Sequence, residues 1–317
     1  MESSQHVHSH SSRKPLKLFL LRFVHSNTYV AIPITAITLA TYITVNHFDF
    51  NFYYITFLFF STLFLYPLHR LIGIYLTIPV EYTPAQRQVD KKPLMARISV
   101  ILGFIGLLFC VPKLSLQIWQ LIIPLSLISI AYSLPLIPTG NGWKRLRDIP
   151  GIKIYAISVV VTLTTSTIPL ILIESISSYD IWLLGIQRFF FILAITIPFD
   201  IRDAHLDKKW NLKTIPLLLN NEKAIRLSVS LLTLPTLIAF TQFYTSAVYG
   251  FEVVIGMVLS QIWATYIIIL FKKHNAALYN DYGAVLKNQW RLQESYDAFR
   301  QAIRLRPEGY ATVSGGG

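Results

Sequence analysis

Three aspartates follow directly on an apolar run, in the stretch FDIRDAHLDKKWNLKT from Phe199 to Thr214. Asp200, Asp203 and Asp207 are spaced i, i+3 and i+7, so they share one helix face if the apolar helix continues through them. Like charges repel on such a face unless a cation lies between them. Mg²⁺ prefers carboxylate oxygens and keeps positions open for substrate phosphates. The spacing therefore indicates a metal and phosphate site, with an ordinary solvated helix end as the alternative.

A second polar stretch, AYSLPLIPTGNGWKRLRDIPGIK, turns through prolines and glycines into a cationic segment. Lys144 and Arg145 stand in it, and Arg202 stands beside the aspartates. Arginine and lysine bind phosphate oxygens through charge-assisted hydrogen bonds. We expect these side chains to bind a diphosphate, and the alternative is plain cationic charge at one membrane face.

The elements that must position these residues are membrane-spanning helices. The chain has 317 residues, of which 53% are apolar and only 14% charged, whereas soluble domains carry about 25% charged residues. Runs of about 20 apolar residues are long enough to cross a bilayer as helices. The sequence predicts an all-α polytopic membrane bundle of about eight spans: Ser26–Val45, Phe52–Ile78, Ile98–Val111, Leu116–Leu134, Ile152–Ile173, Ile181–Phe199, Ala224–Phe243 and Phe251–Phe271.

Basic residues alternate along the chain. The N-terminal segment and the loops after runs two, four, six and eight are rich in Lys and Arg, whereas the intervening loops contain only Lys113. Cytoplasmic loops carry such an excess, so we expect both termini and the polar site on the cytoplasmic side. The net charge of +12 then belongs to one membrane face and requires no nucleic-acid partner. Cys110 is the single cysteine, which excludes an intrachain disulfide.

The two polar stretches resemble motifs of the UbiA-type intramembrane prenyltransferases. FDIRDAHLDKKWNLKTIPLLLN is similar to the family's second aspartate-rich motif, and Tyr132, Lys144 and Arg145 match its tyrosine and Lys–Arg pair. The resemblance implies helices around a central cavity open to lipid. It also implies Mg²⁺ held by Asp200, Asp203 and Asp207 as the catalytic and metal-binding residues. The implied reaction transfers an isoprenoid chain from a prenyl diphosphate to a lipophilic acceptor, such as an aromatic compound or a quinone precursor.

The family's first aspartate-rich motif is absent. The corresponding stretch, YPLHRLIGIYLTIPVEYTPAQRQVDKKPLMARIS, contains only Glu81 and Asp90 as acids. The chain is therefore interpreted as a diverged member, and a non-catalytic protein that binds isoprenoid or scaffolds a partner stays open as the alternative. His69 and Arg70 lie inside run two, where an arginine costs at least about 2.5 kcal/mol unless it faces a cavity or partner. We expect both to contact the diphosphate, although Arg70 extending toward the membrane surface is an equal alternative.

The predicted domain organisation has four parts. Residues 1–20 are expected to be a disordered basic tail, residues 21–273 the membrane domain, and residues 309–317 a disordered terminus. Residues 274–308 resemble one tetratricopeptide repeat, because Gly283, Ala298 and Pro307 stand at positions typical of its two short helices. A single repeat cannot bury its own apolar face, so this helical hairpin is a candidate for binding a protein partner.

Overall fold

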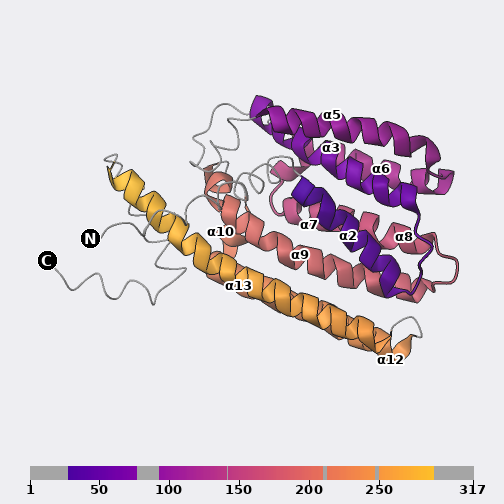
Figure 1. The fold of residues 1–317 in the computed structure, drawn as a ribbon. Coiled ribbons are helices and arrows are strands. Elements are labelled where there is room, and N and C mark those ends of the chain that lie inside the picture. The colour runs from indigo at the N-terminus through magenta and orange to yellow at the C-terminus, as the bar shows by residue number, and fades with distance from the viewer. Residues whose placement is uncertain (1–27, 77–92, 141, 210–212, 247–249, 289–317) are drawn as a thin grey trace, which may run out of the picture. The chain divides into compact units, whose positions relative to one another are not determined.

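The fold is all-α, as a computed structural model of the chain shows (Figure 1). The structure describes residues 28–76, 93–140, 142–209, 213–246 and 250–288. Within them, seven helical segments are long and apolar enough to cross a membrane. An eighth apolar helix, α2 (Thr28–Thr44), has 17 residues. The prediction of a polytopic bundle with about eight apolar helices is confirmed.

Helices are the expected solution because lipid offers no hydrogen-bond partner to the backbone, and a helix pairs its own N–H and C=O groups. Large apolar side chains lie on outward faces, among them Leu127, Leu259 and Trp263, each more than half exposed. Such exposure in water would create large apolar patches. The outward faces are therefore suited to lipid.

The helices form two compact units, the first ending at Leu134 and the second beginning at Pro135. The first unit contains α2, α3 (Phe52–Leu76), α5 (Pro93–Cys110) and α6 (Leu116–Ser133), with the short 3₁₀ turn η1 (Val111–Lys113) before α6. In α5, Gly103 permits a close approach to α3, because a Cβ there would lie 2.6 Å from the backbone nitrogen of Phe64. Figure 1 shows these two helices side by side.

The second unit begins with a hairpin of two short antiparallel strands, β1 (Ile137–Thr139) and β2 (Gly142–Lys144), in which Ile137 pairs with Lys144. A 3₁₀ turn, η2 (Leu146–Asp148), leads to α7 (Ile152–Thr162). This span continues through a π-helical turn, η3 (Leu163–Thr167), into α8 (Ile168–Ile171).

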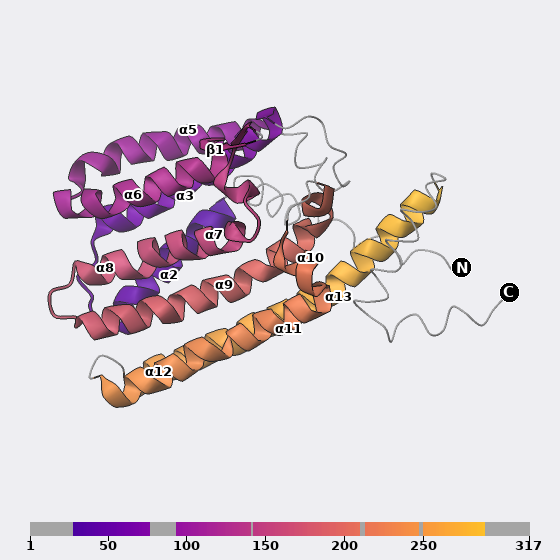
Figure 2. The same ribbon diagram turned by 180° about the vertical axis from the view of Figure 1, so that it is seen from behind.

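The long helix α9 (Ser178–Lys209) is the centre of the second unit. After it come α10 (Ile215–Leu219), α11 (Asn221–Leu231), α12 (Thr233–Thr245) and α13 (Phe251–Asn288). Figure 2 shows α11 and α12 following one another along α13. Ile197 and Ile201 of α9 are fully buried in a core to which Ile154 of α7, Ala224 of α11 and Ile268 of α13 contribute.

Two helix ends differ from the predicted runs. Run six extends beyond Phe199, since α9 continues through the aspartates to Lys209. Run eight extends beyond Phe271, since α13 continues to Asn288 without a break at residue 273. The helical hairpin predicted for residues 274–308 lies mostly outside the described residues, as do the tails predicted at 1–20 and 309–317.

Candidate functional site

The aspartate face, defined as Asp200, Asp203 and Asp207, lies on α9 as the spacing predicts. The helix continues through Pro198 to Lys209, so positions i, i+3 and i+7 after the proline lie on one side of it. Asp200 and Asp207 are buried, with 3% and 8% of their side chains exposed. Asp203 is 26% exposed. Buried carboxylates need a charge partner, because removing them from water is costly.

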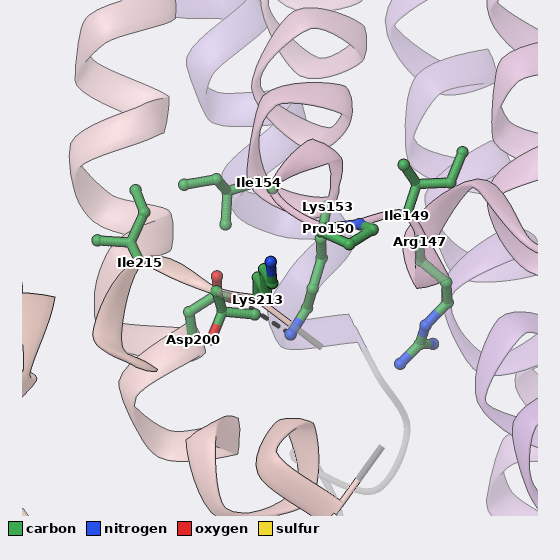
Figure 3. A pocket seen from close by; sticks show the side chains of 10 residues that line it. Arg147, Ile149, Pro150, Lys153, Ile154, Asp200, Lys213 and Ile215 are labelled. Carbon is green, nitrogen blue, oxygen red and sulfur yellow. Dashed lines mark ion pairs between the residues drawn. The ribbon is translucent and has the colours of Figure 1, made fainter. Parts of the chain in front are cut away.

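That partner is Lys153, from the first turn of α7. Its Nζ atom lies 2.9 Å from Asp200 Oδ1, 3.5 Å from Asp207 Oδ2 and 3.9 Å from Asp203 Oδ2. Figure 3 shows the ammonium directed at Asp200. The structure therefore brings the three predicted aspartates together around a lysine from another helix, and we name this group the Lys153–aspartate cluster.

The loop before α7 determines where Lys153 lies. Gly151 precedes the helix with φ of +79°, a left-handed conformation that costs other residues about 1–2 kcal/mol. Its N–H donates to the carbonyl of Lys213, at 3.1 Å, and this bond ties the start of α7 to the segment after α9. Ile154, the residue after Lys153, is buried in the core. The lysine backbone is thus held from both sides.

Burial dominates the electrostatics of the cluster. Loss of water raises the pKa of Asp207, and the neighbouring carboxylates of Asp200 and Asp203 raise it further, while the ammonium of Lys153 opposes both effects. Asp203 receives a second cation, because Arg202 Nε donates to its Oδ1 at 2.9 Å. Three carboxylates and two cations leave this group with a formal charge of −1.

The cluster does not fit the Mg²⁺ ion that the family resemblance implies. A bound Mg²⁺ requires oxygen ligands at about 2.0–2.1 Å in near-octahedral geometry. The position between the carboxylates is taken by Lys153 Nζ. Among the residues that the structure describes, no group of three or more His, Cys, Asp or Glu side chains is arranged to hold a metal ion.

A small pocket lies beside the cluster, and we name it the loop pocket. Its polar lining consists of Arg147, Lys153, Lys213, Asp200 and Thr214 (Figure 3). Three cations and one carboxylate give this lining a formal charge of +2. Thr214 is 5% exposed, and its buried Oγ1 atom has no hydrogen-bond partner. The cations and the spare buried hydroxyl favour an oxyanion oxygen here, and the cavity has room for about one water-sized group.

Three further predicted diphosphate ligands, Lys144, Arg145 and Arg202, lie outside the loop pocket. Lys144 is exposed on β2. Arg145 forms a bidentate ion pair with Asp148, at 2.8 and 2.9 Å, which closes the η2 turn. The Arg202 guanidinium pairs with Asp203 and lies 5.3 Å from the ring centre of Phe199. None of these three belongs to the lining of the loop pocket.

The other predicted ligands belong to the first unit. The rings of His69 and Tyr132 contact each other edge to face, with centroids 6.1 Å apart. Tyr66, one turn earlier on α3, has its hydroxyl 3.1 Å from that of Tyr29. Arg70 is in α3, but its side chain lies outside the described residues. The diphosphate-binding role of His69, Arg70 and Tyr132 stays a prediction.

Sequence reasoning missed Lys153, Lys213 and Thr214. Arg147 follows Lys144 and Arg145 in the cationic stretch considered as a diphosphate clamp, whereas Lys153 contributed only to the positive charge of one membrane face. A usable signal was present for Lys153, because it follows Pro150 and Gly151 and lies one residue inside an apolar run. A lysine at the start of a span needs a partner or a path to water.

No protein-family model matches the chain, and no curated protein matches it. A solved structure concerning the biosynthesis of digeranylgeranylglyceryl phosphate synthase in membranes is similar to it at 13% sequence identity. The TM-score is 0.47, with 90% of this chain and 94% of that chain covered. A likeness at this level decides neither the activity nor the ligands of the present protein.

Proposed function

We propose that the protein is a membrane prenyltransferase of the UbiA type. It transfers an isoprenoid chain from a prenyl diphosphate to a lipophilic acceptor of the aromatic or quinone-precursor class, at the cytoplasmic face. The observation that carries this proposal is the loop pocket, which Arg147, Lys153 and Lys213 line together with Thr214, whose buried hydroxyl has no hydrogen-bond partner. The pocket lies at the polar ends of two apolar spans, where a ligand with a charged head and an apolar chain would bind.

The chemistry that this pocket supports is departure of a diphosphate. Heterolysis of the allylic C–O bond moves the electron pair onto the leaving oxygen and leaves an allylic cation. Arg147 and Lys213 neutralise the departing anion, and Thr214 Oγ1 donates a hydrogen bond to it. The acceptor then attacks the cation and its proton passes to the departed diphosphate, while apolar helix walls exclude water. Lys144, Arg145 and Arg202 add further cationic charge to the same unit.

No step of this proposal passes through Mg²⁺, because the aspartate face does not fit the ion. Asp200, Asp203 and Asp207 instead hold the ammonium of Lys153 at the edge of the loop pocket. Their role in the proposed reaction is to position this cation. The Mg²⁺ requirement implied by the family resemblance stays a prediction.

A second candidate is a non-catalytic protein that binds a prenyl diphosphate without transferring the chain. The paired state of the aspartates favours it, since the carboxylates already have their counter-charge in Lys153. The membrane domain would then deliver or sequester the isoprenoid, and the segment 274–308 would recruit a protein partner.

Two measurements on the purified full-length protein in detergent separate these candidates. One is the binding of a prenyl diphosphate, and the other is its cleavage. We expect binding that weakens about tenfold or more in Arg147→Gln and Lys213→Gln, because each removes one cation from the pocket. Lys223→Gln is the matched control, since Lys223 is exposed on α11 and does not line the pocket.

Release of diphosphate in the presence of an aromatic acceptor identifies a transferase. Binding without release, over a panel of acceptors, identifies the non-catalytic alternative. Equal binding by the wild type and both pocket variants overturns the assignment of the loop pocket.

A further inference from the structure

The three carboxylates of the aspartate face share one cation, and that cation is covalently part of the protein. Lys153 Nζ lies within 4 Å of a carboxylate oxygen from each of Asp200, Asp203 and Asp207. Its side chain is 14% exposed, so most of it is removed from water. Of the three carboxylates, Asp200 and Asp207 lie within hydrogen-bonding distance of the ammonium, and Asp203 at 3.9 Å forms an ion pair with it.

Lys153 supplies positive charge that a divalent cation would otherwise have to supply to the three carboxylates. Three like charges on one helix face repel, and two of these are buried, so the face requires a counter-charge to be stable. Lys153 supplies it from α7, whose first turn is held by the Gly151 N–H bond to the Lys213 carbonyl. No ion has to be recruited from solution for the helices to pack.

We infer that Lys153 is the resident counter-cation of the aspartate face, and that it takes the place of a divalent metal ion there. The wild-type cluster has no affinity for a divalent cation, and a variant without the ammonium gains a metal site formed by the same carboxylates. This inference is independent of the proposed transfer reaction, because it concerns metal binding in the absence of a prenyl substrate.

Mn²⁺ binding to the full-length protein in detergent, followed by electron paramagnetic resonance of the free ion, tests the inference. Mn²⁺ accepts the same oxygen ligands as Mg²⁺. Each protein is compared with its Asp200→Asn counterpart, which shares every other candidate ligand, including the N-terminal histidines. The difference between the two titrations counts the ions bound at the aspartate face.

We expect no difference for the wild type and one additional Mn²⁺ per chain for Lys153→Met, which has a similar length without charge. Lys153→Arg keeps the charge and is expected to behave like the wild type. Mn²⁺ should also raise the melting temperature of Lys153→Met but not that of Lys153→Met/Asp200→Asn, since a ligand that binds the folded state stabilises it.

Binding of one Mn²⁺ by the wild type, lost in Asp200→Asn, overturns the inference, because the carboxylates then accept a metal while Lys153 is present. This arm requires only the wild type and the single variant Asp200→Asn, so it decides even if Lys153→Met does not fold. A folded Lys153→Met protein that gains no ion also overturns it, because the carboxylates are then not a metal-competent set.

Discussion

The two units satisfy their buried polar groups in different ways. In the first unit, buried hydroxyls bond within their own helices, as Thr38 does to the carbonyl of Ile34 and Ser99 to that of Met95. In the second unit, Ser158 and Thr165 also bond within their own helices. Other polar groups there reach a different helix, as Lys153 does to Asp200 and Ser228 to the carbonyl of Ala194. Among its described residues, the first unit buries no charged side chain, whereas the second buries Asp180, Asp200 and Asp207.

The two kinds of hydrogen bonding depend on helix packing to different degrees. A hydroxyl that bonds four residues back needs only its own helix, so its satisfaction survives a shift of that helix. A buried carboxylate whose cation comes from another helix loses that partner as soon as the helices move apart. The second unit therefore has the narrower tolerance, and the proposed site is built in it.

Loss of the Lys153 ammonium should have the largest effect on stability. Lys153→Met leaves buried Asp200 and Asp207 without their cation, and breaking a buried ion pair from one side costs about 3–5 kcal/mol. Thermal unfolding in detergent measures it. Lys208→Met, exposed on the same α9, is the control and should change stability by less than about 0.5 kcal/mol. An equal loss of stability in the two variants would show that Lys153 contributes no more to folding than an exposed lysine does.

A smaller effect is expected in the first unit, where packing rather than charge is critical. In Gly103→Ala the new Cβ would lie 2.6 Å from the Phe64 nitrogen, so α3 and α5 must separate at a cost of about 1–3 kcal/mol. Gly256→Ala is the matched helical control, because nothing lies within 4 Å of a Cβ there. It should be neutral or stabilising by up to about 1 kcal/mol. Comparable destabilisation by both would show that α3 and α5 do not pack closely.

The smallest expected change in stability comes from the loss of one side-chain hydrogen bond. We compare a hydroxyl that bonds to another helix with one that bonds within its own helix. Ser228→Ala removes the 2.7 Å bond to the Ala194 carbonyl and should cost about 0.6 kcal/mol, the typical value for interhelical hydrogen bonds in membranes. Thr38→Val removes a bond within α2 and should cost less, because the Ile34 carbonyl keeps its backbone partner. Urea or thermal unfolding of both variants under one condition measures the difference. A larger loss for Thr38→Val would contradict the contrast between the units.

Much of the fold was predictable because it depends on local pattern. Apolar runs predicted the spans, and their boundaries agree with the helices to within several residues at most ends, as for run four and α6. The largest departures are at Phe199 and Phe271, where helices continue into polar sequence. Hydropathy marks where the apolar segment ends, whereas a helix ends only where its backbone hydrogen bonding stops.

The candidate site was predictable only in part, for the same reason. Asp200, Asp203 and Asp207 were identified because helical spacing places them on one face, whereas Arg145 was assigned to a ligand although it pairs with Asp148. Basic residues in a loop look alike in sequence. Which of them pairs with a neighbour, and which lines a pocket as Arg147 and Lys213 do, depends on how the loop folds.

The sequence by itself determined that the chain is a bundle of apolar helices and that three carboxylates share one face of α9. Both properties follow from the 3.6-residue period and the burial preference of side chains, which act over a few turns of one segment. Only the tertiary structure decided that Lys153 of α7 lies among these carboxylates. The identity of a counter-charge depends on which helix packs alongside and in what register, and no periodicity within α9 contains that information.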